Sequence, residues 1–327
     1  MMSRRTVVAA GLAAITVPAR GATGALLPGV RIEPDHEAMV PVPGGRVYVR
    51  VNGDLRGPRL PVVMLHGGPG SSHWYFLNAT AMAGERAVIL YDQLDCGRSD
   101  TPNDPANWRI ARFVAELGAI RAHLGVKRWH VLGASWGGTV GLEYAAQRPA
   151  ALAGLVLQSP LVSTQVWLQD ARILKDAMPP AVRDLLDRCD VPGAAPQAEC
   201  DAATEAFNAR HVRMLAPPPP IAAYKAALPR SFSEGIYNHM WGRAEFTATG
   251  TLRDYDGRPL LAKLDGKRTL FVAGEHDEAR PETVRGFAEA VPGGADFAEI
   301  AGAAHSVMND APAAYLAVLR DWLARRD

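Results

Sequence analysis

The sequence has no excess of charge of either sign, and this excludes several classes of partner. Its 327 residues include 35 lysines and arginines against 34 aspartates and glutamates, which gives a net charge of +1. A protein that binds nucleic acid through its phosphates needs a basic surface, and no Lys/Arg-rich run supplies one here. No uninterrupted apolar run reaches the ~20 residues of a membrane-spanning helix. We therefore expect no nucleic-acid partner and no stable insertion in a membrane.

Cysteine is scarce, and the sequence lacks the spacing of a metal site. No cluster of histidine and cysteine has a zinc-ligand spacing, so we expect neither a metal nor an organic cofactor. Two of the three cysteines, Cys189 and Cys200, lie close together in a segment rich in Pro, Gly and Ala. In an oxidising compartment they could form a disulfide, whereas in the cytoplasm they would be two thiols, and both alternatives remain open. Cys96 has no partner and is expected to be structural.

The first residues have the pattern of a targeting signal. Ser3-Arg4-Arg5 precedes a mildly apolar, alanine-rich run over residues 6–17, and small residues follow at 19–24. Paired arginines before a short apolar segment resemble a bacterial twin-arginine export signal. This predicts a periplasmic or secreted protein that is cleaved near residues 21–25. The alternative is a disordered extension on a cytoplasmic protein.

Short apolar runs recur along the chain, and helical patterns separate several of them. Continuous apolar strands suit a sheet covered by helices on both faces, and the alternation implies a mostly parallel, doubly wound α/β sheet. Residues 47–51 alternate apolar and polar side chains, as a half-exposed edge strand does. The expected buried strands are residues 62–65, 87–91, 130–132, 155–157 and 270–272, and the expected helices are 110–124, 139–147, 281–291 and 311–325.

The alternation stops between about residues 161 and 245, where the pattern is helical and broken by prolines. Amphipathic pieces near 166–177 and 181–189 indicate a helical cap inserted into the core, and the four prolines at 217–220 are expected to be a stiff connector. There are no internal repeats. The predicted division is an export signal, a first part of the core, the cap and a second part of the core, at residues 1–24, 25–160, 161–245 and 246–327.

The most informative motif is Gly133-x-Ser135-x-Gly137, which follows an apolar run and opens a helical one. That is the setting of a nucleophile elbow, a sharp strand-to-helix turn that exposes a serine hydroxyl. Glycines are needed because a side chain would clash inside so tight a turn. Upstream, a glycine-rich turn containing Gly67 and Gly68 follows the strand at 62–65. We expect the backbone N–H groups of Gly68 and Trp136 to bind an oxyanion.

The expected acid and base of this serine lie near the end of the chain. Asp277 follows the strand at 270–272, and His305 precedes the last helix. The order serine, aspartate, histidine is that of the α/β-hydrolases rather than of the chymotrypsin or subtilisin classes. Asp277 should hold one imidazole nitrogen while the other takes the serine proton. Competing acids are Glu275 and Asp310, and a competing base is His276.

Taken together, these motifs resemble the proline iminopeptidases and the related L-amino-acid amidases over most of the chain after about residue 40. The resemblance is carried by residues 66–70 (His-Gly-Gly-Pro-Gly), 91–93 with 96–99, 133–138, 240–242 with 245–246, and 274–278. It implies an α/β-hydrolase fold with a helical cap, and a serine enzyme that releases an unblocked N-terminal residue, often proline, from a small peptide, an amide or an arylamide.

The resemblance also implies a binding site for the free amino group of the substrate. By position, the carboxylates would be Glu245 and Glu278, since a buried ammonium needs negative charge around it. Gly67 and Trp241 are further expected substrate contacts, and Tyr237 and Phe246 could add apolar walls. One alternative is an esterase, lactonase or amidase that needs no free amine. Another is a catalytically silent fold that binds a ligand or partner.

Overall fold

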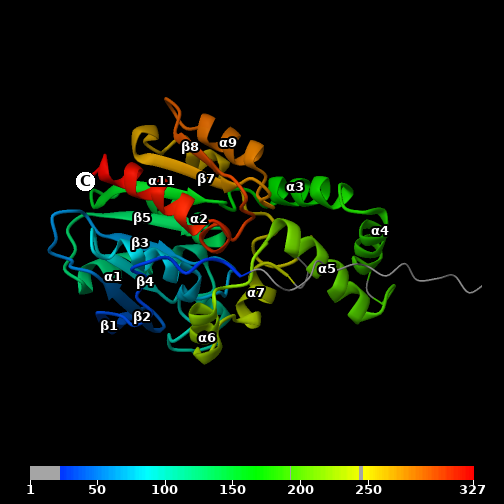
Figure 1. The fold of residues 1–327 in the computed structure, drawn as a ribbon, viewed down its shortest axis with the longest axis horizontal. Helices are drawn as coiled ribbons and strands as arrows, with labels where there is room; N and C mark the ends of the chain where they lie inside the picture. The colour runs from blue at the N-terminus through cyan, green and yellow to red at the C-terminus, as the bar shows by residue number, and fades with distance from the viewer. Residues whose placement is uncertain (1–22, 192, 243–245) are drawn as a thin grey trace, which may run out of the picture.

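The computed structural model describes residues 23–191, 193–242 and 246–327. Its centre is an eight-stranded sheet in the order β1-β2-β4-β3-β5-β6-β7-β8 (Figure 1). The pairs β1–β2 and β2–β4 are antiparallel, and all the other pairs are parallel. The strands are β1 (His36–Val42), β2 (Gly45–Asn52), β3 (Val62–Leu65), β4 (Val88–Tyr91), β5 (Trp129–Ala134), β6 (Leu152–Gln158), β7 (Thr269–Gly274) and β8 (Asp296–Ile300). The predicted, mostly parallel sheet is therefore confirmed.

The central strands are buried on both faces, which explains their continuous apolar sequences. In β3, Val63 and Leu65 belong to one apolar cluster, whereas Val62 and Met64 belong to another on the opposite face. Successive side chains of a strand point to opposite faces, so a strand covered on both sides has no position for a polar residue. The two clusters are the two halves of one layered core.

Helices cover both clusters, and all four helices expected from the pattern in the core are present. They are α1 (Ile110–His123), α2 (Trp136–Ala146), α9 (Pro281–Glu289) and α11 (Pro312–Ala324). Helices α1 and α2 pack on one face, and α11 packs on the other with the 3-10 helix η1 (His73–Met82). The short elements are η2 (Pro105–Asn107), α8 (Arg258–Leu261), η3 (Gly266–Arg268) and α10 (Val307–Asp310).

Five further helices lie between β6 and β7 in sequence, and three of them, α3 to α5, extend to one side of the sheet (Figure 1). They have a small apolar cluster of their own around Leu185, Leu186 and Phe207. The helices are α3 (Thr164–Asp176), α4 (Pro180–Cys189), α5 (Gln197–His211), α6 (Pro219–Ala227) and α7 (Glu234–Met240). We refer to α3–α7 as the cap. The division of the chain into domains stays a prediction.

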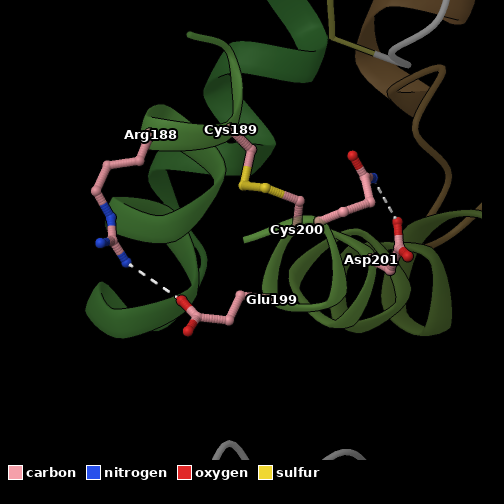
Figure 2. Close-up of a disulfide and its surroundings, with 6 residues drawn as sticks. Arg188, Cys189, Glu199, Cys200 and Asp201 are labelled. Carbon is pink, nitrogen blue, oxygen red and sulfur yellow. Dashed lines mark hydrogen bonds and ion pairs between the residues drawn. A yellow bond between two sulfur atoms is a disulfide. The ribbon is translucent and has the colours of Figure 1, made fainter. Parts of the chain in front are cut away.

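A disulfide joins two cap helices. Cys189, at the end of α4, is bonded to Cys200, in the first turns of α5 (Figure 2). An ion pair between Arg188 and Glu199 lies beside it. Of the two alternatives left open for these cysteines, the structure has the bonded one. Cys96 is a buried thiol, as expected of a structural residue.

One expectation about local structure is wrong, and a second holds only in part. Residues 47–51 do not form an edge strand, because β1 pairs with the outer side of β2. The polar residue in that segment, Arg50, is fully buried and donates to Asn52 and to the backbone oxygen atoms of Arg31 and Ile32. The prolines at 217–220 form the expected stiff connector only in part, since Pro219 and Pro220 begin α6, where the missing N–H groups cost nothing. Within the described ranges, no helix is long and apolar enough to cross a membrane.

Candidate active site

Ser135 lies at the turn between β5 and α2 with backbone angles of φ 55° and ψ −121°. A positive φ is unfavourable for a residue with a side chain, and it is maintained by close packing around the turn. A Cβ atom at Gly133 would come within 2.1 Å of the Gly137 oxygen, and one at Gly137 would come within 2.0 Å of the Leu65 oxygen. No side chain fits at either position. The glycines of the motif are therefore present for the steric reason expected.

Asp277 and His305 come together as the strand order predicts. His305 Nδ1 lies 2.8 Å from Asp277 Oδ1, and the aspartate is buried. Three other groups donate to this carboxylate: the Ala279 N–H to Oδ1, and the Gly274 N–H and the Ser159 hydroxyl to Oδ2. With both oxygens bonded, the carboxylate has one orientation and fixes that of the imidazole.

The three competing residues have other surroundings. Glu275 and His276 are exposed, and their side chains lie 3.9 Å apart on the outer side of the turn. Asp310 is buried but accepts the backbone N–H groups of Met214, Leu215 and Ala304, so its carboxylate holds the loops around the site. None of the three is bonded to the His305 ring in the hydrogen bonds that the structure shows.

The glycine-rich turn lies directly against the serine. A Cβ atom at Gly67 would come within 3.0 Å of Ser135 Cβ, which is tighter than ordinary packing, so glycine suits this close approach. Gly68 has a φ of 113°, a conformation that residues with a side chain rarely adopt. Trp136 is the first residue of α2, and its backbone N–H is one of those that a helix leaves without an internal acceptor. The two expected oxyanion donors thus flank the turn that carries Ser135.

Gln93 links the glycine-rich turn to the start of α2, a role that was not expected from the sequence. Its side-chain amide donates to the backbone oxygen of His66 at 2.9 Å and accepts from the Trp136 indole N–H at 2.9 Å. Its backbone N–H donates to His66 Nε2 at 3.1 Å. All three residues are fully buried. The sequence signals were the place of Gln93 just after β4, at the carboxyl edge of the sheet, and its membership of the 91–93 motif that carries the family resemblance.

His66 completes this arrangement as a neutral imidazole. Burial lowers the pKa of His66 to about 4. Because Nε2 accepts the Gln93 N–H, the ring proton belongs on Nδ1, which lies 3.1 Å from the Gly67 oxygen and donates to it. The ring therefore joins the glycine-rich turn to the end of β4 without adding a charge beside the serine.

A cavity of about 300 Å³ opens over Ser135. Its lining includes Ser135, His305, Gly67 and Gly68, together with Glu278, which is 4% exposed. Glu278 Oε1 lies 3.7 Å from His305 Nε2, the nitrogen that faces away from Asp277. A buried carboxylate thus lies beside the base on the side where a substrate would bind. Further lining residues are Ser71, Trp74, Tyr75, Val212, Arg213, Lys225, Ser231, Phe232, Tyr237 and Ser306.

The end of the cap helix α5 is hydrogen-bonded to the loop that carries Glu278 and to the loop that carries His305. The backbone oxygen of His211 accepts the N–H groups of Glu278 and His305, each at 3.1 Å. The next residue, Val212, accepts the N–H of Ser306 at 2.8 Å. The cap therefore helps to set where Glu278 and His305 lie. Sequence patterns give no sign of this, because the contact joins distant segments through backbone atoms.

Four other expected substrate contacts have different outcomes. Trp241 does not line the cavity: it is buried and packs edge-on against Trp167, whose ring packs in turn against His305. Phe246 packs against Phe207 in the cap, whereas Tyr237 does line the cavity. Glu245 lies outside the described residues. Within those ranges, no three His, Cys, Asp or Glu side chains gather as a metal site would require.

Comparison with known proteins agrees with the observed fold. A family model described as alpha/beta hydrolase fold matches residues 61–312. A proline iminopeptidase of Heyndrickxia coagulans is 37% identical over 88% of this chain and 98% of its own, and one of Levilactobacillus brevis is 37% identical over 89% and 97%. The crystal structure of a Mycobacterium smegmatis proline iminopeptidase has a TM-score of 0.80 at 34% identity, covering 89% of this chain and 98% of that one. The chain belongs to the proline iminopeptidase family of the α/β-hydrolases.

Proposed function

We propose that the protein is a serine hydrolase that releases an unblocked N-terminal residue, with proline favoured, from small peptides, amides or arylamides. The observation that carries this proposal is one cavity lined by Ser135, by His305 bonded to Asp277, and by the buried carboxylate of Glu278. The names of the relatives point to proline as the released residue.

In the proposed mechanism, His305 Nε2 takes the hydroxyl proton as Ser135 Oγ attacks the carbonyl carbon of the N-terminal residue. The tetrahedral intermediate then collapses, the bond to the leaving nitrogen breaks, and His305 gives its proton to that nitrogen. Water, deprotonated by the same imidazole, hydrolyses the resulting ester and regenerates the serine. The Asp277 carboxylate stabilises the imidazolium that forms in both halves of the reaction.

The proposed oxyanion donors are the backbone N–H groups of Gly68 and Trp136. Such groups are effective because they are already oriented before charge develops on the carbonyl oxygen. Here the orientation depends on the packing of two segments against each other, and Gln93 bonds to both. Gln93 is therefore a positioning residue for the oxyanion site.

Glu278 is the proposed partner of the substrate's free amino group. Its carboxylate is buried beside His305 Nε2. The amino nitrogen of the substrate is bonded to the Cα atom next to the scissile carbonyl carbon, so it would lie close to this carboxylate. A buried ammonium without a counter-charge costs several kcal/mol, so an anionic site both binds the free amine and disfavours a blocked one. Glu245 is the second carboxylate that the family resemblance implies, and it remains part of the proposal.

The choice of substrate tests this function. Purified protein should hydrolyse proline 4-nitroanilide and leave its N-acetyl form essentially uncut. Replacing Glu278 by glutamine should lower kcat/KM for the free-amine substrate by about 10- to 100-fold, the worth of a hydrogen bond to a charged group. Hydrolysis of 4-nitrophenyl butyrate, which has no amine, should fall far less. Equal losses on the two substrates would reject amine recognition by Glu278.

The same panel separates the alternatives. An esterase, lactonase or amidase of this fold would cut the butyrate ester or the N-acetyl anilide as well as the free-amine anilide. A silent binding protein would cut none of them and would not react with a fluorophosphonate at Ser135.

Replacing Gln93 by leucine should lower kcat with little effect on KM. Leucine keeps the volume but removes both side-chain hydrogen bonds that join the two oxyanion segments. We expect a loss of up to about 3 kcal/mol, or roughly 10²-fold, because that is the effect of losing one oxyanion donor. A transition-state analogue such as a boronic acid should lose affinity in parallel with kcat. A purely structural role would instead lower the melting temperature and leave the affinity of the folded fraction for the analogue unchanged.

We further propose that the protein is exported through its N-terminal twin-arginine pattern. The disulfide between Cys189 and Cys200 supports this, because such bonds persist in oxidising compartments. The full chain expressed in a bacterium should appear in the periplasm as a shortened form with one titratable thiol, that of Cys96, after unfolding. Replacing Arg4 and Arg5 by lysine keeps the charge and should retain the protein in the cytoplasm. Cytoplasmic accumulation of the unchanged chain at full length would contradict export.

A further inference from the structure

The cavity over Ser135 contains a pair of cations that the proposed reaction does not use. Arg213, just after α5, and Lys225, in α6, both line it. The mechanism above gives a role to neither of them: among the ionisable residues of this lining it uses only His305 and Glu278. A charge that is partly removed from water, as that of the half-buried Lys225 is, costs free energy unless a ligand or partner balances it. A role for Lys225 and its neighbour Arg213 is therefore to be sought in the substrate.

Arg213 and Lys225 have no acidic partner among the described residues. In the part of the chain that the structure describes, no ion pair is formed by the Arg213 guanidinium or the Lys225 ammonium. Among the residues that the structure describes, Glu278 is the one acidic member of the lining. Burial is the main cause that lowers the pKa of Lys225, and the positive charge of Arg213 adds a smaller effect, so the two cations are near enough to repel each other. An anion bound between the two would relieve this repulsion.

The Lys225 ammonium is also held in place. Its Nζ lies 4.5 Å from the centre of the Trp74 ring, a cation–π contact with another residue of the lining. Lys225 is half-buried, so its charge is screened less by solvent than that of a surface lysine. The cation is thus oriented within the cavity, whereas Arg213 is exposed at its rim.

We propose that Arg213 and Lys225 form a second binding site in this cavity, which takes a carboxylate on the leaving part of the substrate. The assignment rests on the proposed function, since it places the free amine at Glu278 and the scissile carbonyl at Ser135. The leaving part then extends into the rest of the cavity, where the lining is cationic. In a dipeptide, the terminal carboxylate is only a few bonds beyond the scissile carbonyl carbon, within reach of two long side chains.

The size of the cavity favours a short substrate. Its volume of about 300 Å³ is at the lower end of the range for small-molecule sites. A dipeptide or tripeptide would fill it and bring its C-terminal carboxylate to the cations, whereas the C-terminus of a long peptide would lie outside. The preferred substrates are therefore short peptides with a free carboxyl group rather than protein chains.

Binding to the Ser135→Ala protein provides a test that does not depend on turnover. Prolylalanine and prolylalaninamide share the same scissile bond and differ only in the terminal carboxylate. Calorimetry should show that the acid binds at least about tenfold more tightly than the amide, as expected for a charge-assisted hydrogen bond. Adding Lys225→Met or Arg213→Met should reduce this ratio, and the double replacement should bring it close to one. Because the ratio of the two affinities is measured for each variant, any effect of the substitution that weakens both peptides equally cancels.

A matched control and a third peptide complete the experiment. Lys127 is exposed in the turn between α1 and β5, outside the cavity lining, so Lys127→Met should keep the full ratio. The third peptide is prolyl-aspartic acid α-amide, whose C-terminal carboxyl group is an amide and whose side-chain carboxylate is free. If it binds like prolylalanine, the site takes either source of carboxylate, and if it binds like prolylalaninamide, the site requires the terminal one.

Two results would overturn the proposal: equal binding of acid and amide to the parent protein, or a preference for the acid that survives the double replacement. Failure of this proposal can be told apart from failure of the proposed function. If the proposed function is wrong, unmodified enzyme will release no proline from either peptide or from proline 4-nitroanilide, whatever the binding ratio in the Ser135→Ala protein.

Discussion

Replacing Ser135 by alanine should lower kcat/KM for proline 4-nitroanilide by roughly six orders of magnitude, the loss known for the nucleophile of a serine protease. The hydroxyl forms the covalent bond, and no other serine of the lining lies on the elbow between β5 and α2. Turnover measured with a large excess of enzyme would give the residual rate. A fluorophosphonate should label the unmodified protein and not the variant.

The fold should be unaffected by this change. Alanine is smaller than serine, and the positive φ at position 135 is set by the glycines around it, so the melting temperature should stay within a few degrees. A matched control is Ser231→Ala, which removes a hydroxyl from the same cavity lining away from the elbow and should leave the nitroanilidase activity within a few-fold. Substantial hydrolysis by a folded Ser135→Ala protein would remove Ser135 from its proposed role.

Replacing Asp277 by asparagine should lower kcat by about 10⁴-fold with a much smaller effect on KM, as for the corresponding change in a serine protease. The buried carboxylate accepts four hydrogen bonds, one of them from His305 Nδ1. An asparagine amide has one acceptor oxygen and an NH₂ group that must face a donor. When the NH₂ faces His305, the imidazole proton moves to Nε2, and the ring can no longer accept the serine proton.

Two measurements separate this effect from simple unfolding. Binding of the substrate to Asp277→Asn should be close to that of the parent protein, because Asp277 does not line the cavity. The equivalent change at the competing acid, Glu275→Gln, affects an exposed side chain and should leave kcat nearly unchanged. If Glu275→Gln were the more damaging of the two, the assignment of the acid would be wrong.

The core of the fold was predictable because its signals are local. Buried parallel strands are short apolar runs, and amphipathic helices have a period that can be read within one segment, so the helices at 110–123, 281–289 and 312–324 were expected within two residues of their ends. The edge strands β1 and β8 were not expected. Their residues are partly exposed and lack an apolar run, so only their pairing with β2 and β7 makes them strands.

Arg50 shows how a local pattern can mislead. An arginine among valines is read as the exposed side of an edge strand, yet this guanidinium is buried and bonded to backbone oxygens of a segment about twenty residues earlier. Trp241 is a similar case at the site. Its position in the motif suggested contact with substrate, whereas its ring packs against Trp167, which itself packs against His305. Whether a large side chain lines a cavity depends on what packs in front of it, and that is a property of the assembled chain.

By itself, the sequence determined the elbow at Ser135, the order of the proposed triad and the parallel sheet that aligns them. Each of these follows from steric limits within a few residues or from the rule that parallel strands present their carboxyl ends on one edge. Only the tertiary structure decided that Gln93 joins the two oxyanion segments, that the end of α5 is bonded to the loops of Glu278 and His305, and that two cations line the cavity. These contacts join residues far apart in the chain, and their partners become defined only when the cap and the core pack together.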